Sequence, residues 1–112
     1  MKLGIIGNGF VGNAIAHAFI PYMEVKIYDK SPDRKINELD EVVNDSDVVF
    51  ISVPTPMRED GTIDLSIVES VFNDIDRVST NEGTVFVLKS TVVPGTTREL
   101  KAKYPRLRIV FN

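Results

Sequence analysis

A chain of 112 residues is long enough for one domain, and 43% hydrophobic and 26% charged residues are the proportions of an ordinary globular protein. A net charge of −3 gives no general attraction to nucleic acid or to an anionic membrane, and no apolar run approaches the roughly 20 residues that a membrane span needs. The absence of cysteine excludes a disulfide, a thiolate metal site and a thiol nucleophile within this chain.

The first twenty residues predict a strand, a glycine-rich turn and a helix. Residues 2–6 are largely apolar, as in a buried strand, and a helix is expected from Phe10 until Pro21 stops it. The apolar residues at helical spacing are Val11, Ala14, Ile15, Ala18 and Phe19. The turn between the two elements reads Gly7, Asn8, Gly9, Phe10, Val11, Gly12. Its glycines also break the apolar stretch that a signal peptide would need, so we expect a cytoplasmic protein.

The turn matches the G-x-G-x-x-G pattern of dinucleotide-binding domains, and it lies between a predicted strand and a predicted helix, as that pattern requires. Gly7 allows a tight turn, Gly9 lets a pyrophosphate approach the backbone, and Gly12 lets the helix pack closely on the strand. The helix N-terminus offers free N–H groups to the phosphates. A second strand over residues 24–28 ends at Asp29, about 20 positions after the glycines, where a carboxylate that binds the adenosine ribose is expected. The sequence therefore predicts a dinucleotide site, with NAD preferred over NADP.

The middle of the chain alternates further helices and strands. A polar stretch after Asp29 leads to a short helix with Ile36, Leu39, Val42 and Val43 on one face. Its many acidic residues lack the spacing of a calcium loop and are expected to face solvent. The strand over residues 48–51 is apolar throughout, as a strand covered on both faces should be. Its exit reads Ser52, Val53, Pro54, Thr55, Pro56, and is followed by a polar loop and a helix that begins after Asp64.

The last third of the chain repeats the pattern. A strand over residues 84–88 ends in a run of hydroxyl-bearing, proline and glycine residues: Lys89, Ser90, Thr91, Val92, Val93, Pro94, Gly95, Thr96 and Thr97. A helix from about Thr97 to Tyr104 follows, and the last strand covers residues 108–111.

Five strands that alternate with helices predict an α/β fold, a Rossmann-type doubly wound parallel sheet. We expect the strand order 3-2-1-4-5, with ligands beyond the carboxyl ends of the strands at the switch point between the first and fourth strands. The candidate site residues at these strand ends are Gly7, Asn8, Gly9, Phe10, Val11, Gly12, Asp29, Lys30, Val53, Pro54, Thr55, Ser90 and Thr91 for the cofactor.

In these motifs the chain resembles the UDP-glucose/GDP-mannose dehydrogenases. The exits after residues 51 and 88, with Asp60-Gly61 and Asp64-Leu65-Ser66 between them, are more specific for this family than the glycine pattern, which many dehydrogenases share. The resemblance covers nearly the whole chain, but only the N-terminal, NAD-binding domain of the family. The segment between the second and third strands is shorter here than in the family.

The resemblance implies the oxidation of a nucleotide sugar's primary alcohol to a carboxylate, as in polysaccharide biosynthesis, with two NAD⁺ consumed. It implies that Val11 and Asp29 contact the adenosine side of NAD and that Pro54 and Thr55 line the cofactor groove. Thr91 matches a threonine near the nicotinamide and the reacting carbon, where its hydroxyl would assist catalysis. It also implies a homodimer for the full-length enzyme.

The sequence leaves alternatives open at several residues. Thr91 can instead be a turn residue that bonds its own backbone, and Thr55 a part of a rigid strand exit. Arg34 or Lys35 can stack on adenine, meet a phosphate, or lie in a solvated turn.

The family's catalytic cysteine, lysine and asparagine follow this domain, and the motif that starts at Asn112 would continue with Pro-Glu-Phe. We therefore expect residues 1–112 to be one NAD-binding domain of a longer enzyme, inactive alone, with the nucleotide sugar bound by the missing portion. Two other interpretations remain: a non-catalytic dinucleotide-sensing domain, and the NAD-binding domain of a hydroxyacid-type dehydrogenase.

Overall fold

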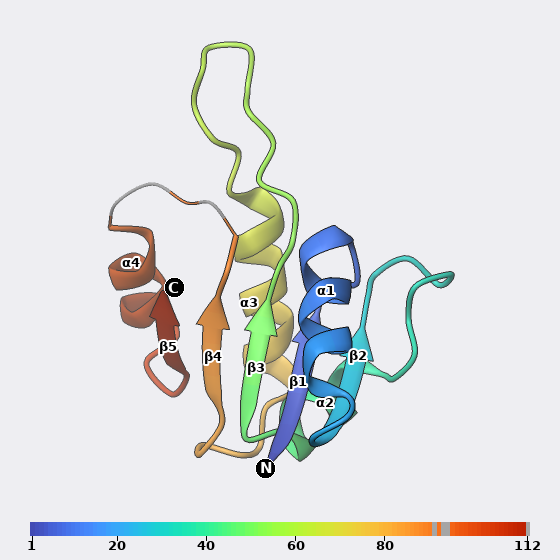
Figure 1. The fold of residues 1–112 in the computed structure, drawn as a ribbon. Helices are drawn as coiled ribbons and strands as arrows, with labels where there is room; N and C mark the ends of the chain where they lie inside the picture. Colours follow the sequence, from blue (N-terminus) through green and yellow to red (C-terminus); the bar gives the residue numbers. More distant parts are fainter. Residues whose placement is uncertain (91, 93–94, 112) are drawn as a thin grey trace.

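Strands and helices alternate along the whole chain, as the sequence predicts (Figure 1). The computed structural model describes residues 1–90, 92 and 95–111. Its elements are β1 (Lys2–Ile6), α1 (Phe10–Phe19), β2 (Glu24–Tyr28), α2 (Leu39–Asp45), β3 (Val48–Ile51), α3 (Ser66–Val78), β4 (Val85–Leu88), α4 (Thr96–Lys103) and β5 (Arg108–Phe111). All four strand pairings are parallel.

The order of the strands is β2-β1-β3-β4-β5, so the predicted order 3-2-1-4-5 is wrong. β3 lies next to β1, with Leu3 opposite Val48, and not outside β2. The physical reason lies in the strands themselves. β2 alternates the polar Glu24 and Lys26 with apolar residues, which suits an edge, whereas the uniformly apolar β3 needs the shielded centre. The switch point therefore lies between β1 and β3, where this strand order also places ligands.

Two layers of side chains cover the two faces of the sheet. On one face α1 packs over a small cluster formed by Leu3, Ile5, Ala16 and Ile27. The larger cluster, on the opposite face, joins the sheet to α2, α3 and α4 and includes Val42, Ile51, Phe72 and Leu100. Figure 1 shows α1 on the near side of the sheet and α3 on the far side. Helices on both faces explain why half of the strand residues are buried.

The packed face of α1 differs in part from the predicted one. Val11, Ala14 and Ala18 are exposed, and the buried residues of the helix are Gly12 and Ala16. Their small side chains let the helix approach β1 closely. Of the predicted residues, Ile15 and Phe19 are half-buried and pack against the small cluster, while the fully buried positions of the helix belong to the small residues Gly12 and Ala16.

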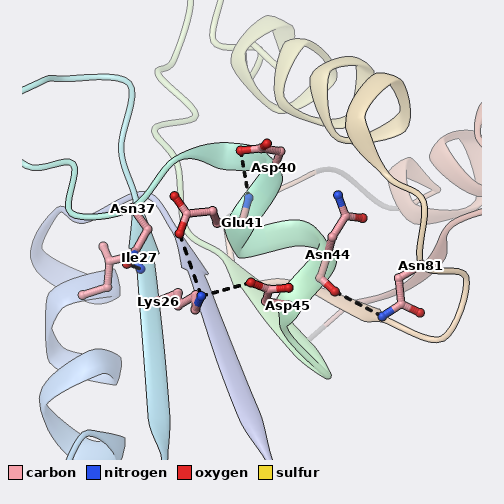
Figure 2. A network of polar contacts seen from close by, with 8 residues as sticks. All are labelled: Lys26, Ile27, Asn37, Asp40, Glu41, Asn44, Asp45 and Asn81. Atoms are coloured by element: carbon pink, nitrogen blue, oxygen red, sulfur yellow. Dashed lines mark hydrogen bonds and ion pairs between the residues drawn. The ribbon is translucent and has the colours of Figure 1, made fainter.

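α2 is fastened to the edge of the sheet by polar contacts (Figure 2). Lys26 of β2 extends its Nζ atom to Asp45, at 3.1 Å, and to Glu41, at 3.9 Å, both on α2. The hydrogen bond with Asp45 raises the pKa of Lys26 above its ordinary value. At the same C-terminal end of the helix, the carbonyl of Asn44 accepts a hydrogen bond from the Asn81 side chain at 3.4 Å. Glu41 and Asp45 thus hold α2 against the sheet. Among the described residues, no group of three or more acids and histidines is placed to hold a metal ion.

A protruding hairpin joins β3 to α3 and stands beyond the carboxyl edge of the sheet (Figure 1). We call residues 56–64 the β3–α3 hairpin. Met57 and Ile63 form an antiparallel bridge, and the Arg58 N–H donates to the Thr62 carbonyl at 2.7 Å. Gly61 has a φ of +88°, which confirms the turn predicted from Asp60-Gly61. No helix within the described part of the chain is long and apolar enough to cross a membrane.

Candidate functional site

Two glycines of the turn after β1 are required by their close backbone neighbours. Gly7 has a φ of +98°, and a Cβ atom built on it would lie 2.0 Å from the carbonyl oxygen of Ser52. A Cβ atom on Gly12 would lie 1.8 Å from the carbonyl oxygen of Gly7. The turn is also tied to β2, because the Gly7 N–H donates to the Tyr28 carbonyl at 2.9 Å. These contacts fit the turn and packing roles predicted for Gly7 and Gly12.

Gly9, in contrast, faces open space. A Cβ atom on this glycine would meet nothing within 4 Å, so the fold itself does not require glycine here. Gly9 is also the N-cap of α1, and within the described residues no side-chain hydrogen bond caps this helix start. Open space beside free N–H groups at a helix start is the arrangement that receives a phosphate. The residues present therefore fit a dinucleotide's pyrophosphate.

A pocket of about 850 Å³ opens at this turn, across the carboxyl ends of β1, β2 and β3. Its walls are the glycine turn, the end of β2 with the loop that follows, the exit of β3, and the part of α3 from Ser66 to Asp74. It is lined by Ile6, Gly7, Gly9, Phe10, Val11, Tyr28, Asp29, Lys30, Ser31, Arg34, Ser52, Val53, Pro54, Ser66, Ile67, Ser70, Val71 and Asp74.

The pocket gathers most of the predicted site residues but not all of them. Those on its wall are Gly7, Gly9, Phe10, Val11, Asp29, Lys30, Val53 and Pro54. Those that do not line it are Asn8, Gly12, Thr55 and Ser90. Thr91, the predicted assisting catalytic residue, lies outside the described residues. Because the carboxyl ends of parallel strands share one edge, residues from three separate strand exits meet here.

Asp29 joins the glycine turn to the loop after β2. One carboxylate oxygen accepts a hydrogen bond from the Asn8 N–H at 2.7 Å, and the other accepts one from the Ser31 N–H at 2.8 Å. A carboxylate oxygen has two acceptor positions, so each retains one that can receive a ribose hydroxyl. Asp29 thus joins two walls of the pocket and also lines the pocket itself.

Ser90 has a different place from the predicted one. Its buried hydroxyl accepts a hydrogen bond from the Val53 N–H at 2.9 Å and donates one to the Val53 carbonyl at 2.8 Å. The hydroxyl's single hydrogen is therefore used within the protein. Ser90 fastens the exit of β4 to the exit of β3, and it supports the pocket wall at Val53 from behind.

Sequence reasoning missed the wall formed by α3. Its pocket-facing residues recur every three or four positions, at Ser66, Ile67, Ser70, Val71 and Asp74. They lie beside the buried core residues Val68, Phe72 and Ile75, and Val71 also packs against that core. That spacing was readable from the sequence, but a mostly polar helix face indicates solvent unless the position of the helix is known.

The family described as the UDP-glucose/GDP-mannose dehydrogenase family, NAD binding domain, matches residues 34–107, about two-thirds of the chain. The matched part contains the β3 exit and the run from Lys89 to Thr97, while the glycine turn lies before it.

Among curated proteins the chain is similar to nucleotide-sugar dehydrogenases. It is 30% identical to the UDP-glucose 6-dehydrogenase AglM of Haloferax volcanii, an alignment that covers 87% of this chain and 30% of that protein. It is 28% identical to a UDP-glucose 6-dehydrogenase of Streptococcus pneumoniae, with 100% of this chain and 35% of that protein covered. The second alignment spans 141 positions, so the relative carries segments that these 112 residues lack.

Solved structures of other nucleotide-sugar dehydrogenases share the fold. The GDP-mannose dehydrogenase of Pseudomonas aeruginosa, solved as a ternary complex, superposes with a TM-score of 0.82 at 24% identity over 100% of this chain and 36% of that one. The UDP-glucose dehydrogenase of Pyrobaculum islandicum gives a TM-score of 0.78 at 25% identity over 98% of this chain and 34% of that one.

The chain spans about a third of the length of these relatives. The family match covers the two strand exits whose motifs carried the resemblance, and the five-stranded fold is that of the family's cofactor domain. NAD is the cofactor of that domain. The chain therefore belongs to the UDP-glucose/GDP-mannose dehydrogenase family, and it corresponds to the family's NAD-binding domain.

Proposed function

We propose that residues 1–112 bind NAD as the cofactor domain of a nucleotide-sugar 6-dehydrogenase. The observation that carries the proposal is the pocket at the β1–β3 switch point, where the open side of Gly9 and the carboxylate of Asp29 line one cavity. A dinucleotide needs these two features together, since one receives its pyrophosphate and the other its adenosine ribose.

Each wall of the pocket has a role in this proposal. The backbone of Gly9, Phe10 and Val11 at the start of α1 holds the pyrophosphate, because unpaired N–H groups and the helix dipole favour negative charge there. Asp29 accepts hydrogen bonds from the ribose hydroxyls. Val53 and Pro54 give the groove an apolar side, and we assign Thr55 and Thr91 to its nicotinamide end.

The proposed reaction of the whole enzyme is the oxidation of the sugar's primary alcohol to a carboxylate in two hydride transfers. When bound, NAD⁺ supplies the hydride acceptor. The remaining requirements are a base for the hydroxyl proton and a nucleophile that holds the intermediate aldehyde. The chain has no cysteine, and its only histidine, His17, is exposed on α1 and does not line the pocket. We therefore assign the nucleophile and the sugar site to a further domain, and homodimer formation to the full-length enzyme.

The test is a titration of the 112-residue chain with NADH and with NADPH, followed by nicotinamide fluorescence. The chain has no tryptophan, so indole emission does not interfere. We expect wild type to bind NADH more tightly than NADPH, because the Asp29 carboxylate repels a 2′-phosphate. Asp29→Ala should weaken NADH binding and reduce the preference.

Asp33→Ala is the matched control, since Asp33 is an exposed acid in the same loop that does not line the pocket. It should leave both affinities unchanged. Binding of NADPH to wild type as tight as that of NADH would contradict the assignment of Asp29, and the absence of NADH binding would contradict the proposed function.

A further inference from the structure

Asn8 is the residue between the first two glycines of the turn, and its side chain does not line the pocket. Instead it makes two hydrogen bonds within the protein. Its Nδ2 donates to the carbonyl of Arg34 at 2.9 Å, and its Oδ1 accepts from the Asn13 side chain at 3.1 Å. Its backbone N–H meanwhile donates to Asp29 at 2.7 Å. One residue thus joins the glycine turn to α1, to the end of β2 and to the loop after β2.

We infer that Asn8 is a positioning residue for adenosine recognition, and that it acts by holding Arg34 at the pocket. This inference rests on the proposed function, because it assumes that the pocket receives NAD. The bond to the Arg34 carbonyl spans 26 positions of sequence and ties the middle of the loop to the glycine turn. The adenosine half of the dinucleotide then meets the loop after β2, which is held by β2 at its start and by Asn8 at Arg34.

The loop that Asn8 holds carries two neighbouring cations with different surroundings. Within it, the N–H groups of Arg34 and Lys35 both donate to the Ser31 carbonyl at 3.1 Å, which closes a tight turn. Arg34 lines the pocket together with Lys30. Lys35 is instead paired with Glu38, with its Nζ atom 2.9 Å from a carboxylate oxygen. The loop's placement therefore decides which of the two cations faces the ligand.

The chemistry of Arg34 suits an adenine ring. A planar guanidinium stacks on aromatic faces and is weakly hydrated, whereas an ammonium is a strongly hydrated point charge. Arg34 makes no ion pair or side-chain hydrogen bond with any described residue. Its side chain is thus available to the base of the nucleotide, next to the carboxylate of Asp29 that we assign to the ribose.

Asparagine meets the requirements of position 8 because it offers a donor and an acceptor on one short side chain. Aspartate at this position lacks the donor for the Arg34 carbonyl and places a negative charge beside the pyrophosphate site. Alanine lacks both groups. Serine ends one atom short of the Asn8 Nδ2 position.

A double-mutant cycle on NADH affinity tests whether Asn8 acts through Arg34. Arg34→Ala removes the guanidinium and keeps the carbonyl that Asn8 binds, while Asn8→Ala removes the anchor and keeps the guanidinium. We expect each single variant to lose about fivefold in NADH affinity. The double variant should bind NADH no more weakly than the single variant of lower affinity, because both changes remove the same interaction. Lys35→Ala, which removes a neighbouring cation turned away from the pocket, is the matched control and should bind like wild type.

The outcomes separate this inference from the proposed function. Wild-type affinity in Asn8→Ala, or losses that multiply in the double variant, would overturn the inference while NADH binding by the wild type stands. A wild-type chain that does not bind NADH would overturn the proposed function and this inference together. If Asn8→Ala does not fold, as judged by circular dichroism, Asn8→Ser takes its place in the cycle.

Discussion

The glycines of the turn between β1 and α1 differ in what adjoins them. Gly12 lies against the backbone of Gly7, whereas Gly9 borders the pocket. A methyl group added at Gly12 must displace protein atoms, whereas one added at Gly9 must displace a ligand. A substitution at Gly12 is therefore expected to lower mainly the free energy of unfolding, and one at Gly9 to lower mainly the affinity for NADH.

For Gly9→Ala we expect the free energy of unfolding to fall by less than about 1 kcal/mol, the usual effect of alanine at an N-cap. NADH affinity should fall by about tenfold or more, equivalent to about 1.4 kcal/mol. Gly12→Ala should instead lower the free energy of unfolding by about 1–3 kcal/mol through overpacking. Urea unfolding and NADH titration of both variants provide the measurements. Wild-type NADH affinity in Gly9→Ala would contradict the role given to this residue.

At the residue level, the sequence predicted the positions that depend on local spacing and missed those that depend on distant partners. Gly7, Gly9 and Asp29 follow from the strand–turn–helix context, and they line the pocket. The partners of Ser90 and Asn8 lie 37 and 26 positions away in sequence, at Val53 and Arg34. A hydroxyl or amide in a strand exit gives no sign of whether it will contact a ligand or another exit.

At the level of elements, hydrophobic patterning predicted β1, β2, β3 and β5 at their observed bounds. The order of the strands required a further step, from the pattern within each strand to its place in the sheet. The alternation in β2 and its absence in β3 contain that information. Ile36, which the pattern assigned to the short helix, lies before α2 and is exposed.

The β3–α3 hairpin should respond to acid before the sheet does. The hydroxyl and N–H of Thr62 lower the pKa of Asp60, and the N–H of Ser66 lowers the pKa of Asp64, both below the ordinary 3.8. Such carboxylates stabilise the folded hairpin above that ordinary value, and the contribution is lost as the pH falls through their lowered pKa values. We expect the amide resonance of Thr62 to shift toward its random-coil position below pH 3.8 while those of β1 and β3 stay fixed.

Asp60→Asn should remove most of this pH dependence, because an amide does not titrate in this range. Glu59→Gln is the control, since Glu59 makes none of these hydrogen bonds and its replacement should leave the profile unchanged. A hairpin that responds to acid equally in wild type and Asp60→Asn would refute the assignment.

At the level of the whole molecule, the chain forms the cofactor pocket and spans about a third of the length of its relatives. We expect the purified 112-residue chain to produce no NADH from UDP-glucose and NAD⁺, because it lacks a cysteine nucleophile to hold the intermediate aldehyde. The assay is absorbance of NADH, with NADH binding by the same sample as proof that the pocket is intact. Sustained turnover would mean that the catalytic groups lie within these residues.

The glycine turn is short in sequence, yet its shape depends on β2 and β3. Gly7 is held by the Tyr28 carbonyl and lies against the Ser52 carbonyl, and the Ser52 N–H in turn donates to Ile6 at 2.9 Å. Those contacts arise only after two crossovers have closed, and long-range closure is the slow part of folding. During refolding, helix formation will therefore precede the recovery of NADH binding. A bound cofactor thus reports that the last of these strands has joined the sheet.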